Sequence, residues 1–195
     1  QRGERGLPKL LPGLNFIAGL NGETEESYRM NLELLRSLRD EGLWLRRINI
    51  RQVEGQGFQE IPAEIFRQFK REVREGIDRP LLEEMLPLGT VLKRIWWESH
   101  DDRIRRPEQV LDPMHRDESI RGTAGITFGR QIGAYPILVG LPYKVPLESS
   151  TDVIITGHGM RSITGVETGM DVNTATQHQL EAIPGIGSKG SWRLV

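Results

Sequence analysis

The residues best suited to chemistry in this sequence lie in the segment "GLNGETEES", residues 19–27. Gly19 and Gly22 lack a side chain, so a ligand can approach the backbone there, and Glu23 follows directly. The segment comes after a short apolar run, and α/β proteins bind ligands at the carboxyl ends of parallel strands. The residues therefore suit a ligand site; an ordinary turn between a strand and a helix is the alternative.

A second group of candidate residues closes the chain, in the segment "LEAIPGIGSKGSWRLV", residues 180–195. Its Gly-Ile-Gly sequence permits a tight turn between two short helices. The backbone N–H groups that begin the second helix could hold a phosphate without touching a base. Docking of a protein and simple packing are the alternative uses of such a turn.

Composition limits the chemistry that these residues can perform. The 195 residues include 26 basic and 27 acidic side chains and no cysteine, so the chain offers neither a basic field for nucleic acid nor a thiolate ligand. The four histidines are scattered without a metal-ligand spacing, and we expect no metal site in this chain. No apolar run approaches the roughly 20 residues of a membrane span, which predicts a cytoplasmic protein with no membrane partner. The chain begins with Gln1 rather than Met, and we expect it to be a fragment of a longer protein.

The elements that would position the first site form a strand, a helix and a second strand. Residues 14–20 are mostly apolar and stop at Asn21 and Gly22, as a buried strand does. Thr24 is a good helix N-cap, and Gly42 is placed to end the helix. Residues 43–53 indicate the next strand. This order predicts a βαβ unit with a parallel sheet.

The rest of the chain predicts helices, then a small barrel, then helices again. A helix is expected after Pro62, and a second, shorter one is marked off by Pro80 and Gly89. From residue 89 several short strands at hairpin spacing predict a small antiparallel barrel, with a long loop at residues 100–121. Near the end, Asn173 or Thr174 is expected to cap a helix. The predicted fold class is thus α/β, then β-barrel, then α, with domains at residues 1–88, 89–168 and 171–195.

The segments "FIAGLNGETEESYRMNLELLRSL" and "LWLRRINIRQVEGQGF" resemble the fifth and sixth strands of the partial barrel of radical S-adenosylmethionine enzymes. The resemblance covers roughly residues 7–88. It implies contacts to the adenosyl part of S-adenosylmethionine, and we carry over as cofactor-binding candidates Ile17, Gly19, Gly22, Glu23, Ile48, Asn49 and Ile50. The family's CxxxCxxC loop, which holds its [4Fe-4S] cluster, is missing because the chain has no cysteine. The cluster would therefore belong to the full-length protein.

Two further resemblances concern nucleic acid. The segments "GTVLKRIWWES", "TFGRQIGAYPILVGLP" and "DVIITGHGMRSITGV" are similar to the TRAM-type barrel of methylthiotransferases, an OB-like barrel that binds RNA. This similarity makes Arg130, Tyr135 and Arg161 candidate contacts; a small folding module in which Trp96 and Trp97 fill core and rim is the alternative. The terminal segment resembles the helix-hairpin-helix family, and its matching residues are Gly185, Ile186, Gly187, Ser188, Lys189 and Gly190.

Taken in order, these resemblances imply the C-terminal portion of a radical S-adenosylmethionine enzyme that cleaves its cofactor reductively. Its partners would be the missing N-terminal half of the same polypeptide and the phosphate backbone of a nucleic acid. The alternative is a non-enzymatic module that binds DNA or RNA without sequence preference. A structural or protein-docking domain is the third possibility. The βαβ unit separates the first hypothesis from the others, because a pure binding module has no need of part of a barrel.

Overall fold

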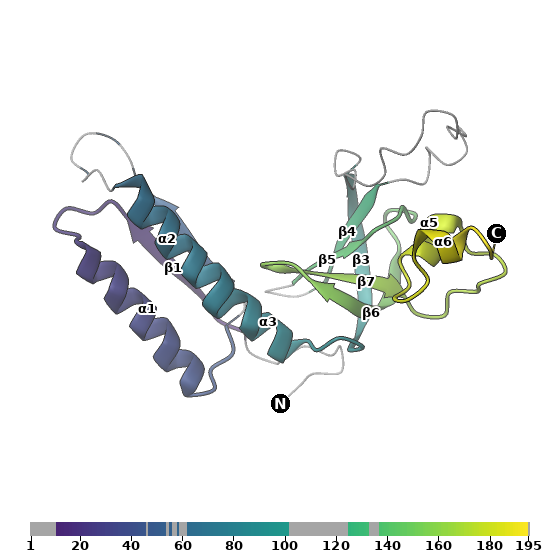
Figure 1. The fold of residues 1–195 in the computed structure, drawn as a ribbon, viewed down its shortest axis with the longest axis horizontal. Coiled ribbons are helices and arrows are strands. Elements are labelled where there is room, and N and C mark those ends of the chain that lie inside the picture. The colour runs from purple at the N-terminus through teal and green to yellow at the C-terminus, as the bar shows by residue number, and fades with distance from the viewer. Residues whose placement is uncertain are drawn as a thin grey trace. The chain divides into compact units, whose positions relative to one another are not determined.

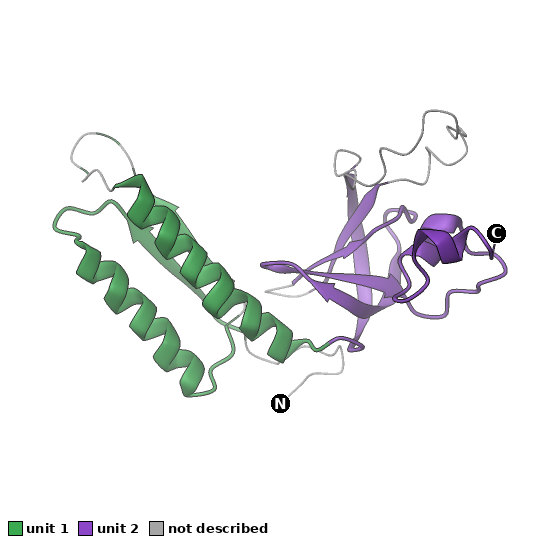
Figure 2. Ribbon diagram, in the orientation of Figure 1, with its two compact units in different colours: residues 1, 8–87 green, residues 2–7, 88–195 purple. Residues whose placement is uncertain are grey.

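The computed structural model describes residues 11–45, 47–53, 55, 58, 62–101, 125–132 and 137–194. These residues form two compact units that divide between Pro87 and Leu88 (Figure 2). In the described parts of the chain, no helix combines the length and the apolar character needed to cross a bilayer.

The first unit is built on the predicted βαβ arrangement, which the structure confirms (Figure 1). Strand β1 (Gly13–Ala18) pairs in parallel with β2 (Arg47–Gln52), in a register that aligns Asn15 with Asn49. Helix α1 (Glu25–Asp40) connects them. The helix starts as predicted, because the side-chain oxygen of Ser27 accepts the backbone N–H of Thr24 at 3.2 Å. It ends at Gly42, whose φ of 75° favours glycine.

The helices after β2 form one rod rather than the two separate helices that the sequence suggests (Figure 1). Helix α2 (Ala63–Val73) continues through one turn of π-helix, η1 (Arg74–Asp78), into α3 (Arg79–Met85). Pro80 does not break the rod, because it lies in the first turn of α3, where proline is well tolerated.

The core of the first unit lies between the sheet and its helices. Leu35, Ile48 and Val73 are completely buried. The ring of Phe69 meets Phe16 and Tyr28 edge to face, with centroid distances of 6.1 and 5.2 Å. The other buried members of this cluster are Ala18, Tyr28, Leu32, Leu45, Ile77 and Leu81. The helices thus cover one face of the sheet, and β1 and β2 present alternate residues to it.

The second unit contains the predicted barrel. Five strands close on themselves in the order β3-β4-β5-β7-β6: β3 (Val91–Asp101), β4 (Ile126–Gln131), β5 (Leu138–Leu141), β6 (Ser150–His158) and β7 (Ser162–Glu167). The barrel is not wholly antiparallel as expected, because β5 and β7 pair in parallel. An odd number of strands cannot alternate in direction all the way round, so one parallel pair is required. Most of the predicted long loop lies outside the described residues.

Two glycines allow neighbouring strands of the barrel to approach closely. Trp97 is fully buried and donates its indole N–H to the Thr151 hydroxyl at 3.0 Å. A Cβ on Gly129 would lie 2.5 Å from the Trp97 ring, and one on Gly165 would lie 2.2 Å from Val153. Trp96 is 38% exposed, so the two tryptophans fill rim and core as the alternative interpretation of the barrel predicts.

The chain ends in two short helices, α5 (Gln177–Glu181) and α6 (Gly187–Ser191). The expected cap at Asn173 or Thr174 is wrong, and Thr176 caps α5 instead. The Thr176 N–H donates to the Gln179 side-chain oxygen at 2.8 Å, and the Gln179 N–H donates to the Thr176 hydroxyl at 3.4 Å. Asn173 and Thr174 lie in a separate turn before the helix, in which the Asp171 carboxylate accepts the Asn173 N–H at 2.9 Å.

Candidate functional site

The turn at the carboxyl end of β1 is held by one carboxylate. Glu23 Oε2 accepts the backbone N–H of Gly19 at 2.7 Å and the hydroxyl of Tyr28 at 2.9 Å. Gly19 and Gly22 have φ values of 100° and 88°, which a residue with a side chain rarely adopts. Burial, and then the hydrogen bond to Glu23, raises the pKa of the Tyr28 phenol well above its usual range, so this donor stays protonated. The sequence therefore fixes a backbone turn just beyond the strand.

The sheet face that the helices do not cover carries an amide pair, which lies four residues before Gly19 along β1. Asn49 Nδ2 donates to Asn15 Oδ1 at 2.7 Å, across the register that pairs the two residues. By strand alternation the same face holds Ile17, which is 50% exposed, and the exposed residues Arg47 and Arg51. We call this surface the open face; it consists of Gly13, Asn15, Ile17, Arg47, Asn49 and Arg51. It combines hydrogen-bonding amides, guanidinium groups and one apolar side chain.

The structure brings most of the candidate cofactor residues to this end of the unit. Ile17 and Asn49 lie on the open face, and the turn carries Gly19, Gly22 and Glu23. The side chains of Ile48 and Ile50 lie on the other face and pack with the helices. A ligand could therefore meet only their backbone groups, of which the Ile48 carbonyl already accepts a hydrogen bond from Arg74 Nη1. Sequence reasoning missed Asn15, although its alignment with Asn49 follows from the parallel register.

The residues present do not fit an iron–sulfur cluster. The sequence has no cysteine, and among the described residues no group of three or more His, Asp or Glu side chains could hold a metal ion. The donor set of the open face and the turn does fit an adenosyl group, because it offers amide groups, an apolar side chain and accessible backbone.

The candidate phosphate residues gather at the turn between α5 and α6. Gly185 and Gly187 have φ values of 92° and 58°, and they allow the chain to reverse there. Ser188 and Lys189 are exposed in the first turn of α6. A Cβ on Gly190 would lie 3.1 Å from Ile186, so glycine at this position lets the turn pack against the helix.

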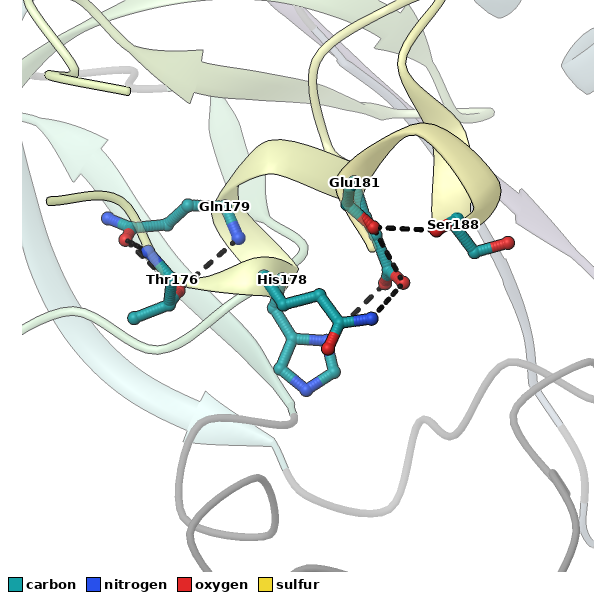
Figure 3. A network of polar contacts seen from close by, with 7 residues as sticks. Thr176, His178, Gln179, Glu181 and Ser188 are labelled. Carbon is teal, nitrogen blue, oxygen red and sulfur yellow. Dashed lines mark hydrogen bonds and ion pairs between the residues drawn. The ribbon is translucent and has the colours of Figure 1, made fainter. Parts of the chain in front are cut away.

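A small polar network ties the two terminal helices together (Figure 3). Glu181 Oε1 accepts the Ser191 hydroxyl at 3.5 Å and the Gln177 amide at 3.4 Å. Its other oxygen lies 3.5 Å from His178 Nδ1. The Ser191 hydroxyl also donates to the Ser188 carbonyl at 2.8 Å. These contacts orient the turn that carries Lys189.

The barrel candidates are less concentrated. Arg130 forms an ion pair with Glu98, and the strand register places it beside the half-exposed ring of Trp96. Arg161 is exposed in the turn between β6 and β7. Tyr135 lies outside the described residues. An exposed cation next to an aromatic ring is the combination that stacks on nucleic-acid bases, although here the cation already has an acidic partner.

Comparison with other proteins finds this chain similar to part of two longer archaeal proteins. An uncharacterized protein of Archaeoglobus fulgidus is 38% identical over 190 residues, which cover 92% of this chain and 32% of that protein. An uncharacterized protein of Methanocaldococcus jannaschii is 36% identical over 176 residues, which cover 85% of this chain and 28% of that protein. The chain spans about a third of the length of these relatives. No protein-family model matches it.

Proposed function

We propose that this chain is the C-terminal part of a radical S-adenosylmethionine enzyme, with the open face and the β1 turn forming one wall of the cofactor site. The observation that carries the proposal is that Glu23 fixes the turn at Gly19 at the end of the strand whose open face carries the Asn15–Asn49 pair. A fixed turn, a parallel strand pair and an uncovered face together make a ligand wall at the carboxyl end of a sheet. The greater length of the relatives supports the same proposal, because it provides room for the rest of a barrel.

The residues of this chain would bind and orient the cofactor. Asn15 and Asn49 offer amide donors and acceptors to a purine or ribose, and Ile17 offers an apolar surface beside them. Arg47 and Arg51 place positive charge on the same face, which suits a carboxylate. When bound, S-adenosylmethionine supplies the chemistry of reductive carbon–sulfur cleavage. The cluster that this chemistry needs would be held by cysteines outside these 195 residues.

The test uses the longer polypeptide that contains this chain. Purified without oxygen, it should show iron–sulfur absorption and bind S-adenosylmethionine in a calorimetric titration. Asn49→Ala should weaken binding about tenfold, because it removes a hydrogen-bonding side chain from the open face. Gln68→Ala, which removes an exposed amide from α2, is the matched control and should bind normally. A polypeptide with neither iron nor affinity for the cofactor would rule the proposal out.

A second candidate function is nucleic-acid binding through the terminal helices, alone or as the means by which the enzyme holds a polymeric substrate. The specific observation is the glycine-shaped turn that exposes Ser188 and Lys189 at the start of α6. Such a turn would hold backbone phosphates and would not read bases. Because the net charge of the chain is only −1, binding would depend on this local cation rather than on a general field.

Fluorescence anisotropy with labelled RNA and DNA at low salt tests this second function. Lys189→Glu should weaken binding to every sequence alike and reduce its dependence on salt. Lys70→Glu makes the same charge change on an exposed residue of α2 in the first unit and should leave binding unchanged. Equal affinity of the two variants would exclude the terminal turn as the binding site.

A further inference from the structure

The two edges of the β1–β2 sheet are not equivalent, and the hydrogen-bond pattern shows which backbone groups each exposes. The Val53 N–H donates to the Ala18 carbonyl at 2.9 Å, and Ala18 is aligned with Gln52. In a parallel pair, alternate residues of each strand direct both backbone groups toward the partner strand. Even-numbered residues of β1 therefore face β2, and Asn15 and Ile17 direct their N–H and C=O groups to the outer edge of β1.

The same alternation turns Ile48, Ile50 and Gln52 toward the outer edge of β2. That edge is closed at Ile48, whose carbonyl accepts a hydrogen bond from Arg74 Nη1 at 2.7 Å. Arg74 is in turn ion-paired with Asp78, and their side chains are only 17% and 7% exposed. A strand that paired with β2 here would have to displace Arg74 and leave the Asp78 carboxylate buried without its cation. Such a loss is costly, so this edge resists a further strand.

Among the residues that the structure describes, none guards the outer edge of β1 in this way. No residue in the described part of the chain hydrogen-bonds to the outward backbone groups of Asn15 or Ile17. An edge of this kind is a template for another strand.

Helix α1 carries a matching apolar surface. Met30 is 59% exposed and Leu34 is 48% exposed, and four residues apart they form a stripe along the helix. Arg36, on the flank that meets α2, pairs with Glu72 at 3.6 Å. At about 100° per residue, Leu34 lies on the opposite flank from Arg36. The stripe therefore faces away from α2, toward the position that a neighbouring helix would occupy.

We infer that the rest of a polypeptide of the relatives' length joins this unit on the β1 and α1 side, by a strand and a helix. The strand pairs in parallel with β1 through Asn15 and Ile17, and the helix packs on Met30 and Leu34. The inference rests on the partial barrel of the proposed function and adds to it the side on which the missing part docks. The occupant is the remaining two thirds of the relatives' length, and the parallel β1–β2 pair favours it, since parallel strands are normally buried on both faces.

Amide hydrogen exchange on the longer polypeptide and on the 195-residue chain tests the inference. The Asn15 and Ile17 amides should exchange at least about 100-fold more slowly in the longer polypeptide, because they become ladder hydrogen bonds there. The Ile50 and Gln52 amides should exchange at the same rate in both. Protection at Ile50 and Gln52, or at neither edge, would overturn the inference. Equal protection of Ile17 in a homodimer of the 195-residue chain would also overturn it, in favour of a second copy.

Matched variants of the longer polypeptide provide a second measurement. Ile17→Pro removes an outward N–H from β1 and should lower Tm by several degrees, whereas Gln52→Pro removes the equivalent group from β2 and should not. Leu34→Arg should also lower Tm, whereas Leu43→Arg should not. The two leucines are a matched pair, because their side chains are 48% and 46% exposed. Equal effects within each pair contradict the inference. If the Asn15 and Ile17 amides are protected in the longer polypeptide but it binds neither iron nor S-adenosylmethionine, the radical chemistry is refuted and the docking inference stands.

Discussion

The hydroxyl of Tyr28 and the carboxylate of Glu23 lie 2.9 Å apart and join the first buried turn of α1 to the end of β1. The same carboxylate oxygen holds the Gly19 N–H, so one side chain fixes the strand, the turn and the helix together. Glu23 thus has a structural role before any ligand is considered. A ligand at this turn would meet a backbone whose shape is already set.

Removal of the Glu23 carboxylate should therefore destabilise the first unit. Glu23→Ala leaves the Gly19 N–H and the Tyr28 hydroxyl without their acceptor, and we expect a loss of about 1–3 kcal/mol in the free energy of unfolding. Glu25→Ala, which shortens an exposed acidic residue at the start of α1, is the control. Urea denaturation followed by circular dichroism measures both. Equal stability of the two variants would mean that the shared acceptor contributes nothing.

The buried ion pair on the rod of helices should be more sensitive to single than to double substitution. Arg74→Met leaves the Asp78 carboxylate buried without the Arg74 guanidinium, and we expect a loss of about 3–5 kcal/mol. Arg74→Met combined with Asp78→Leu removes both charges and should recover most of the stability. The comparison is made by thermal unfolding. A double variant as unstable as the single one would show that the pair itself, not the orphaned charge, governs stability.

The barrel glycines predict a graded response to alanine. Gly129→Ala and Gly165→Ala place a methyl group 2.5 Å or less from a neighbouring atom, and each should cost about 1–3 kcal/mol of stability. Gly157→Ala is the matched control in β6, because its Cβ would lie 3.7 Å from the Thr164 side chain, an ordinary contact. Differential scanning calorimetry should give a lower Tm for Gly129→Ala and for Gly165→Ala than for Gly157→Ala. A harmless Gly165→Ala would contradict the close packing of β6 on β7.

Asp152 should contribute to the acid limb of the stability profile. Hydrogen bonds from the Lys93 ammonium at 2.7 Å and the Arg94 N–H at 2.9 Å hold the pKa of its carboxyl below the ordinary value of 3.8. Because the folded-state pKa is the lower one, this stabilisation is present above pH 3.8 and is lost as the pH falls through the folded-state value. Asp152→Asn should lower Tm at pH 7 and flatten its decline below pH 3.8. Parallel profiles for wild type and Asp152→Asn would refute this.

The local signals of the sequence account for most of the fold. Thr24 and Gly42 bound α1 because capping depends on neighbouring residues alone. The order of strand, helix and strand then fixed a parallel pair. The sequence analysis missed two features: a local hydrogen bond from the Asn173 N–H to the Asp171 carboxylate forms a turn ahead of the last cap at Thr176, and closure of an odd-stranded barrel makes the β5–β7 pair parallel.

The candidate site was only partly predictable for a related reason. The glycines of the β1 turn stand out in the sequence, since φ values near 90° favour glycine. Asn15 becomes visible only when the register aligns it with Asn49. Ile48 and Asn49 are adjacent in sequence yet lie on opposite faces, so a motif that covers both cannot say which of them meets a ligand.

The turn of π-helix at Arg74–Asp78 corrects the phase of the rod that contains it. Apolar side chains of this rod recur every four residues, at Ile65, Phe69, Val73, Ile77, Leu81 and Met85. An uninterrupted α-helix would rotate such a series by about 40° at each step, and the stripe would wind out of the core. A π turn holds more residues than an α turn, so the apolar side chains that follow it rotate back toward the core. If the same residues formed α-helical turns with no change in length, this correction would be lost and the apolar side of α3 would swing toward solvent, whereas deletion of one residue between 74 and 78 would give an α turn and keep that side in the core.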